Sequence, residues 1–133
     1  MRAARRMYQV LALGSLGLAA MAAAPAAKHT HLERSEPGGD STISVAPTAI
    51  KLWFSEGVQI RVTTVRITRA DSTTIEVAPA RQGAGEHAPV ILDIRGTVAP
   101  GRYSVAWRTM SRDGHPVRGT FAFTLAAPSP PTH

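Results

Sequence analysis

The sequence contains no cysteine, which excludes disulfide bonds, thiolate metal sites and lipid attachment at a terminal cysteine. Methionine is also scarce, because Met1, Met7 and Met21 lie within the first 27 residues and only Met110 lies in the rest of the chain. A thioether-rich Cu(I) site needs several methionine sulfurs. The chain beyond residue 27 cannot build such a site alone.

Long hydrophobic runs are missing as well. The apolar stretch 10–24 has about 15 residues, fewer than the roughly 20 that span a bilayer as a helix. It follows an arginine-rich segment at the start of the chain. This order of basic and apolar segments predicts a secretory signal peptide over residues 1–27. We therefore expect a periplasmic protein whose mature chain does not insert into a membrane.

Charge and length restrict the function further. Cleavage of the leader removes three arginines and lowers the formal net charge from +6 to +3. The remaining basic residues are scattered along the chain, so a nucleic-acid partner is not indicated. About 105 residues remain, enough for one domain with one core.

Short stretches of alternating apolar and polar residues, separated by turn residues, predict β-strands. They cover positions 32–35, 50–54, 63–67, 75–77, 90–94, 103–107 and 121–125. About seven regularly spaced strands favour an all-β, antiparallel, immunoglobulin-like sandwich. Tyr103 after Pro100-Gly101 is typical of a tyrosine corner, with Trp107 in the core.

The domain is predicted to cover residues 28–126. Residues 83–89 read as a loop because they are rich in glycine and end in proline. Residues 127–133 contain several prolines and no apolar periodicity, which predicts a disordered tail.

Two polar motifs carry the candidate chemistry. Asp113 and His115 are two positions apart, so in an extended backbone their side chains point the same way. Pro116 restricts the backbone of His115. His29 and His31 form a second pair, close to the start of the mature chain. Imidazole and carboxylate donors suit Cu(II), although each motif alone is also typical of a hairpin turn or a loose terminus.

Four motifs in this order resemble the CopC-type family of periplasmic copper-binding proteins, and the likeness covers nearly all of the mature chain. They are His29-Thr30-His31-Leu32 with Ser35-Glu36-Pro37, Leu52-Trp53-Phe54-Ser55-Glu56, the segment from Pro100 to Arg108, and the segment from Ser111 to Phe121. The resemblance implies a Greek-key β-sandwich or barrel that binds Cu(II).

By the same resemblance, the copper ligands are His29, Asp113 and His115, and the family site takes both the amine and the imidazole of a terminal histidine. Glu56 matches a glutamate that some members add, and His31 is expected nearby. The implied role is that of a carrier or buffer in copper homeostasis or resistance, without catalysis. Such a protein passes the metal to an inner-membrane partner of the CopD type.

The cleavage position stays open and decides what His29 contributes. A cut after Ala27 exposes Lys28, and only a cut before His29 gives two donors from that residue. A cut after Ala26 makes His29 the third residue. The amine, two deprotonated amides and the imidazole then enclose Cu(II) or Ni(II) in a square plane, which fits the tetragonal nitrogen ligation that Cu(II) prefers.

Two other functions compete with that of a copper carrier. A histidine-brace copper oxygenase needs a broad aromatic substrate face, but aromatic residues make up only 5% of the sequence. A β-sandwich adhesion or assembly module needs no metal, so tight stoichiometric Cu(II) uptake distinguishes it from a copper carrier. Some relatives place a methionine-rich loop where this chain has residues 83–89, and His87 in that loop is expected to be solvent-exposed.

Overall fold

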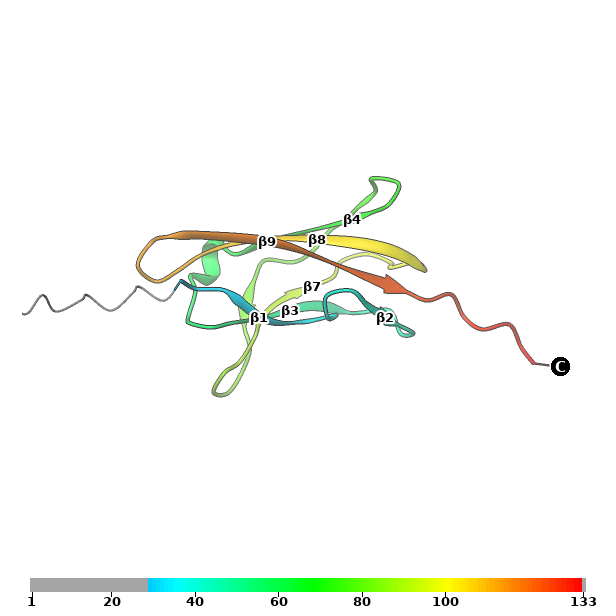
Figure 1. Ribbon diagram of the computed structural model, residues 1–133, viewed down its shortest axis with the longest axis horizontal. Coiled ribbons are helices and arrows are strands. Elements are labelled where there is room, and N and C mark those ends of the chain that lie inside the picture. Colours follow the sequence, from blue (N-terminus) through cyan, green and yellow to red (C-terminus); the bar gives the residue numbers. More distant parts are fainter. Residues whose placement is uncertain (1–28, 133) are drawn as a thin grey trace, which may run out of the picture.

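The computed structural model describes residues 29–132, which form two β-sheets packed face to face (Figure 1). The predicted signal peptide, residues 1–27, lies outside the described residues. The prediction of an all-β sandwich is confirmed. In the described part of the chain, no helix combines the length and the hydrophobicity needed to cross a membrane.

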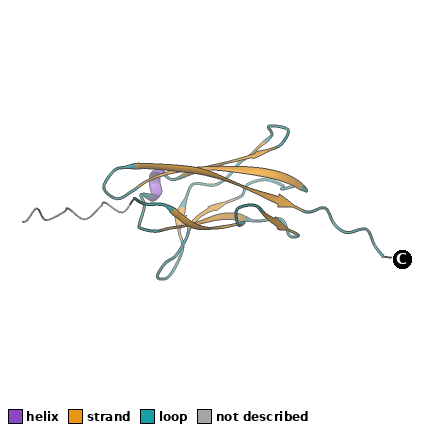
Figure 2. Ribbon diagram, viewed as in Figure 1, coloured by secondary structure: helices purple, strands orange, loops and turns teal. Residues whose placement is uncertain are grey.

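Nine strands and one short 3-10 helix make up the regular structure of the described residues (Figure 2). They are β1 (Leu32–Glu36), β2 (Ser41–Ile43), β3 (Ala49–Phe54), η1 (Ile60–Val62), β4 (Thr64–Arg69), β5 (Thr74–Ile75), β6 (Arg81–Gln82), β7 (Val90–Asp93), β8 (Gly101–Met110) and β9 (Pro116–Leu125).

One sheet has the strand order β1-β3-β7-β6 and the other β2-β9-β8-β4-β5. The prediction of about seven strands missed β2 and β6, which have only three and two residues and show no apolar alternation. The expectation of purely antiparallel pairing was wrong for β2, which runs parallel to β9.

The core lies between the sheets and is filled by alternate residues of the long strands. Its buried members are Ile50, Leu52, Val65, Ile67, Val90, Leu92, Val98, Tyr103, Val105, Trp107, Phe123 and Leu125. Burial of each large apolar side chain contributes roughly 1.5–3 kcal/mol. The two sheets are therefore held together mainly by this apolar layer.

The tyrosine corner and the core tryptophan are both confirmed. The Tyr103 hydroxyl donates to the Ala99 carbonyl oxygen at 2.5 Å, and the Tyr103 ring stacks on Phe123 with 5.2 Å between ring centroids. Trp107 makes an edge-to-face contact with Phe54 at 5.3 Å. Both contacts join side chains that are distant in sequence, so they fix how the strands pack.

The pairing of β1 with β3 brings the start of the described chain to the end of β3. Leu32 lies opposite Phe54, and the Ser55 amide donates to the His31 carbonyl oxygen at 2.9 Å. An isolated bridge joins Val58 to Ser111, the residue that follows β8. Three segments that are distant in sequence thus meet at one end of the sandwich.

β9 ends at Leu125, and the amide of the next residue, Ala126, donates to the Ile43 carbonyl oxygen at 2.8 Å. Residues 127–132 form no regular secondary structure, are exposed and lead away from the sandwich (Figure 1). Residues 83–89 form the predicted loop between β6 and β7. The predicted disorder of the tail stays a prediction.

Candidate metal centre

The turn between β8 and β9 carries Asp113 and His115. It is closed by the Ser111 amide, which donates to the His115 carbonyl oxygen at 2.9 Å, and by the Gly114 amide, which donates to the Ser111 carbonyl oxygen at 3.0 Å. Gly114 has a φ of 92°, a conformation that residues with a Cβ rarely adopt. The backbone is therefore a tight turn and not an extended segment, so the alternation argument for Asp113 and His115 does not apply here.

The turn still brings the two predicted ligands together. His115 Nδ1 lies 2.9 Å from Asp113 Oδ2, while the Ser111 hydroxyl donates to Asp113 Oδ1. These hydrogen bonds from Ser111 and His115 lower the pKa of Asp113 to about 2. The carboxylate is therefore ionised at any physiological pH and available as a metal ligand.

Both side chains are largely open to solvent, with 79% of the His115 and 69% of the Asp113 side-chain surface exposed. A solvent-exposed contact of this kind contributes little to stability. The pair can therefore open to admit a third partner at small cost.

Beneath the exposed pair lies a polar network with buried members, which links the turn to the loop after β3. The Gln59 side-chain amide donates to the Ser111 carbonyl oxygen at 3.0 Å. The Thr63 hydroxyl donates to the Gln59 carbonyl oxygen at 2.8 Å and lies 2.7 Å from the Thr109 hydroxyl. Since one hydroxyl has one proton, Thr109 donates to Thr63.

Ser111 connects this polar network to both Asp113 and His115. Its side chain is buried, and its hydroxyl accepts the His115 amide at 3.0 Å while donating to Asp113. Sequence reasoning missed Gln59 and Ser111 as supporting residues. The signal was weak. Thr109 in β8 and Thr63, directly before β4, are buried polar residues in alternating patterns that are otherwise apolar on the inward face.

Most of the predicted ligands line one cavity of about 260 Å³. Its lining consists of His29, Thr30, Glu56, Ser111, Asp113, His115, Pro116 and Val117. His29 and Thr30 begin the described chain, Glu56 follows β3, and the other lining residues belong to the β8–β9 turn and the start of β9. Four of the five predicted ligands thus border one cavity.

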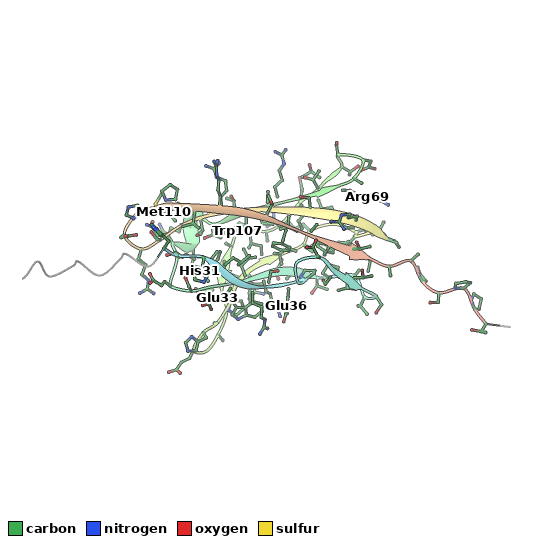
Figure 3. All side chains as sticks on the ribbon, viewed as in Figure 1. His31, Glu33, Glu36, Arg69, Trp107 and Met110 are labelled. Atoms are coloured by element: carbon green, nitrogen blue, oxygen red, sulfur yellow. The ribbon has the colours of Figure 1, made fainter. Side chains whose placement is uncertain are left out.

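His31 is the exception, because it does not line this cavity. Its ring Nδ1 donates to the His29 carbonyl oxygen at 3.2 Å, and its backbone amide donates to the Ser55 hydroxyl at 3.0 Å. His31 and Met110 lie toward the same end of the sandwich, opposite Arg69 (Figure 3). The His31 ring thus contacts the backbone of His29, which does line the cavity.

The donor set fits Cu(II), which accepts imidazole nitrogen and carboxylate oxygen. Within residues 29–132, however, no group of three or more His, Cys, Asp or Glu side chains lies close enough to hold a metal ion. Asp113 and His115 contact each other instead. Metal binding therefore requires rotation of these exposed side chains.

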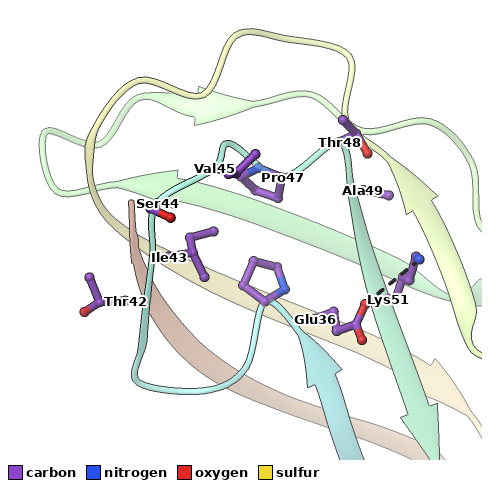
Figure 4. Close-up of a pocket in the computed structure, with 10 residues that line it drawn as sticks. Glu36, Thr42, Ile43, Ser44, Val45, Pro47, Thr48, Ala49 and Lys51 are labelled. Carbon is purple, nitrogen blue, oxygen red and sulfur yellow. Dashed lines mark ion pairs between the residues drawn. The ribbon is translucent and has the colours of Figure 1, made fainter. Parts of the chain in front are cut away.

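Two further cavities are less suited to a metal. One of about 490 Å³ is lined in part by Glu56, His87 and Arg112. The positive charge of the Arg112 guanidinium disfavours the binding of a metal cation there. The other, of about 460 Å³, lies at the opposite end, where Glu36 pairs with Lys51 at 3.9 Å (Figure 4). His87 is exposed in its loop, as predicted.

Comparison with known proteins identifies relatives of the whole domain. Protein YobA of Escherichia coli K12 is 32% identical over 97 residues, which cover 73% of this chain and 78% of YobA. The crystal structure of CopC from Methylosinus trichosporium OB3b superposes with a TM-score of 0.66 at 28% identity, covering 74% of this chain and 94% of CopC.

A second solved structure, PcoC of Escherichia coli, is described as a methionine-rich copper resistance protein. It superposes with a TM-score of 0.63 at 29% identity, covering 74% of this chain and 99% of PcoC. By contrast, Met110 is the only methionine among the residues described here. These similarities support a copper-related function, and the CopC domain matches residues 32–126. The chain belongs to the CopC family.

Proposed function

We propose that this protein binds one Cu(II) ion in the 260 Å³ cavity, with His29, Asp113 and His115 as ligands. The observation that carries the proposal is the meeting of these residues and Glu56 around one cavity, although they come from distant parts of the sequence. Glu56 is a carboxylate at the same rim and an additional ligand in this proposal. His31 stays a predicted neighbour of the site.

The choice of Cu(II) over Cu(I) follows from the donors. Cu(I) prefers soft sulfur ligands, whereas the residues at this cavity offer imidazole nitrogen and carboxylate oxygen. Affinity should decrease from neutral to mildly acidic pH, because each imidazole must be neutral to bind. The ionised Asp113 adds nothing to this dependence, since its pKa of about 2 lies well below that range.

In this proposal the protein acts after export, as a periplasmic carrier or buffer that passes copper to an inner-membrane partner of the CopD type. No catalytic step is required. A copper oxygenase is less well supported, because none of the aromatic side chains among the described residues is exposed. A polysaccharide-binding face needs such side chains.

Calorimetric titration with Cu(II) tests the proposal. The mature protein should bind one equivalent, and Asp113→Asn should weaken binding on the order of 100-fold through loss of a ligand charge. Asp71→Asn is the matched control, because Asp71 is an exposed carboxylate in the turn after β4 at the other end of the molecule. Equal affinities for the two variants would refute the proposed site.

A further inference from the structure

The two sheets differ sharply in charge. In the four-stranded sheet, acidic and basic residues pair, as in Arg34–Glu36 at 2.9 Å and Arg81–Asp93 at 2.8 Å. The three central strands of the other sheet, β9, β8 and β4, contain arginines and no aspartate or glutamate. Three of these arginines, Arg66, Arg108 and Arg118, are exposed and make no ion pair within residues 29–132.

These three side chains share the outward face of the sheet. Arg108 lies directly opposite Arg118 and also opposite Thr64, which is two residues before Arg66 on the same face of β4. We call Arg66, Arg108 and Arg118 the basic face. Like charges directly opposite on neighbouring strands destabilise a sheet. The fold therefore tolerates the repulsion between Arg108 and Arg118, which a carboxylate in place of either arginine would remove.

A groove of about 600 Å³ opens on this face. Its lining consists of Val62, Thr64, Arg108, Thr109, Met110, Pro116, Val117 and Arg118. Val62 is an exposed apolar residue, with 45% of its surface accessible. The groove thus combines apolar side chains with two of the unpaired guanidinium groups.

The groove and the candidate copper cavity share a wall. Pro116 and Val117 line both of them, and Met110 lies toward the same end of the sandwich as His31 (Figure 3). Any segment bound in the groove would therefore contact residues next to Asp113 and His115.

We propose that the groove is the docking site for an acidic segment of a protein partner that exchanges copper with this chain. Charge complementarity carries the assignment, because carboxylates would neutralise Arg108 and Arg118 and form charge-assisted hydrogen bonds with them. A second copy of this chain would bring the same positive face, so it does not fit. The concave, partly apolar lining suits a peptide segment better than a flat lipid surface. The role in copper exchange rests on the proposed function.

Titration of the copper-free, isotope-labelled mature protein with a ten-residue peptide of glutamate and leucine tests the docking site. We expect amide chemical-shift changes centred on residues 108–110, 117 and 118. The same peptide with glutamine in place of glutamate should bind at least about tenfold more weakly. Equal binding of both peptides, or shifts centred elsewhere, would overturn the proposal, as would binding to phosphatidylglycerol vesicles without binding to the acidic peptide.

Arg118→Glu provides the decisive variant. It should weaken peptide binding by about tenfold or more, yet raise the melting temperature by about 1–5 °C, because it places opposite charges across β8 and β9. Arg95→Glu changes the charge equally at the far end, beyond β7, and should alter peptide binding by less than about twofold. Equal weakening by both variants would show a nonspecific charge effect and overturn the assignment.

Copper titration separates this proposal from the proposed function. Arg118→Glu should keep its Cu(II) affinity, because Arg118 does not line the copper cavity. If the wild-type protein bound the peptide but no copper, the proposed function would fail and the docking site would stand. If it bound copper but no acidic peptide, the docking site alone would fail.

Discussion

The two ends of the sandwich are built in different ways. At the end that carries the candidate copper cavity, the exposed residues Asp113 and His115 both hydrogen-bond to Ser111, which is buried. At the opposite end, Tyr103 is 1% exposed and ties β8 to the preceding loop through its hydroxyl. The difference implies that the exposed ligands serve binding and the buried core residues serve folding stability. A substitution in either group should change one property without the other, whereas a substitution of the buried supporting residue Ser111 should change both.

His115→Ala should have the largest effect and act on binding alone. Loss of an imidazole ligand should weaken Cu(II) binding on the order of 100-fold, while the melting temperature of the copper-free protein stays nearly unchanged because the side chain is exposed. Calorimetric titration and thermal denaturation measure the two quantities. His87→Ala is the control, since His87 is exposed in a different loop. A large fall in melting temperature for His115→Ala would contradict the claim that this residue serves binding and not folding stability.

Tyr103→Phe should show the reverse pattern. It removes the hydrogen bond to Ala99 and leaves a partly buried carbonyl oxygen without that donor, which should cost about 1–3 kcal/mol of the free energy of unfolding. Copper affinity should not change, because Tyr103 lies near the start of β8 and the turn lies at its end. Urea denaturation followed by copper titration checks both parts. A weakened copper site would mean that the two ends are coupled.

Ser111→Ala should affect both properties moderately. The variant loses the donor to Asp113 and the acceptor for the His115 amide. Supporting residues of metal ligands typically change affinity 10–100-fold, so we expect about tenfold weaker Cu(II) binding, with a loss of about 1 kcal/mol in stability. Ser104→Ala, an exposed serine on the same strand, is the control. Unchanged copper affinity in Ser111→Ala would show that the network does not position the ligands.

The smallest effect concerns the ion pair between Arg81 and Asp93. Asp93 lies opposite Ala49 at the start of β3, away from the candidate copper cavity. The hydrogen bond from Arg81 lowers the pKa of Asp93. Because the pKa of Asp93 is lower in the folded protein, its ionised form stabilises the fold at any pH above the pKa of an unfolded aspartate, about 3.9. This stabilisation is lost as the pH falls through the pKa of Asp93 in the folded protein. Asp93→Asn should therefore be slightly less stable at neutral pH and equal to the wild type in strong acid. Thermal denaturation from neutral pH to strong acid measures this difference in stability between variant and wild type. A difference that grew in acid would contradict a stabilising ion pair at Asp93.

The sequence predicted the long strands well, because their apolar residues alternate over many positions. β3, β4, β8 and β9 follow this pattern, and Tyr103 and Trp107 lie in the core as expected. β2 and β6 were missed because so few residues show no periodicity. The parallel pairing of β2 with β9 depends on packing that no local pattern encodes.

The candidate site was predicted mainly through resemblance to a family. Local reasoning identified Asp113 and His115 as donors but left open whether their backbone is extended or a turn, and the positive φ of Gly114 gives a turn. The approach of Glu56 to the same cavity depends on the bridge between Val58 and Ser111. Such long-range contacts arise from the whole fold, so the sequence alone could not establish them.

The most direct test of the central claim is the location of copper in crystals of the Cu(II)-loaded mature protein, measured by anomalous diffraction at the copper absorption edge. The account predicts one strong peak in the cavity between His29, Asp113 and His115, with Glu56 at its rim. A peak at His87 or beside Glu36, with the Asp113–His115 contact intact, would contradict it.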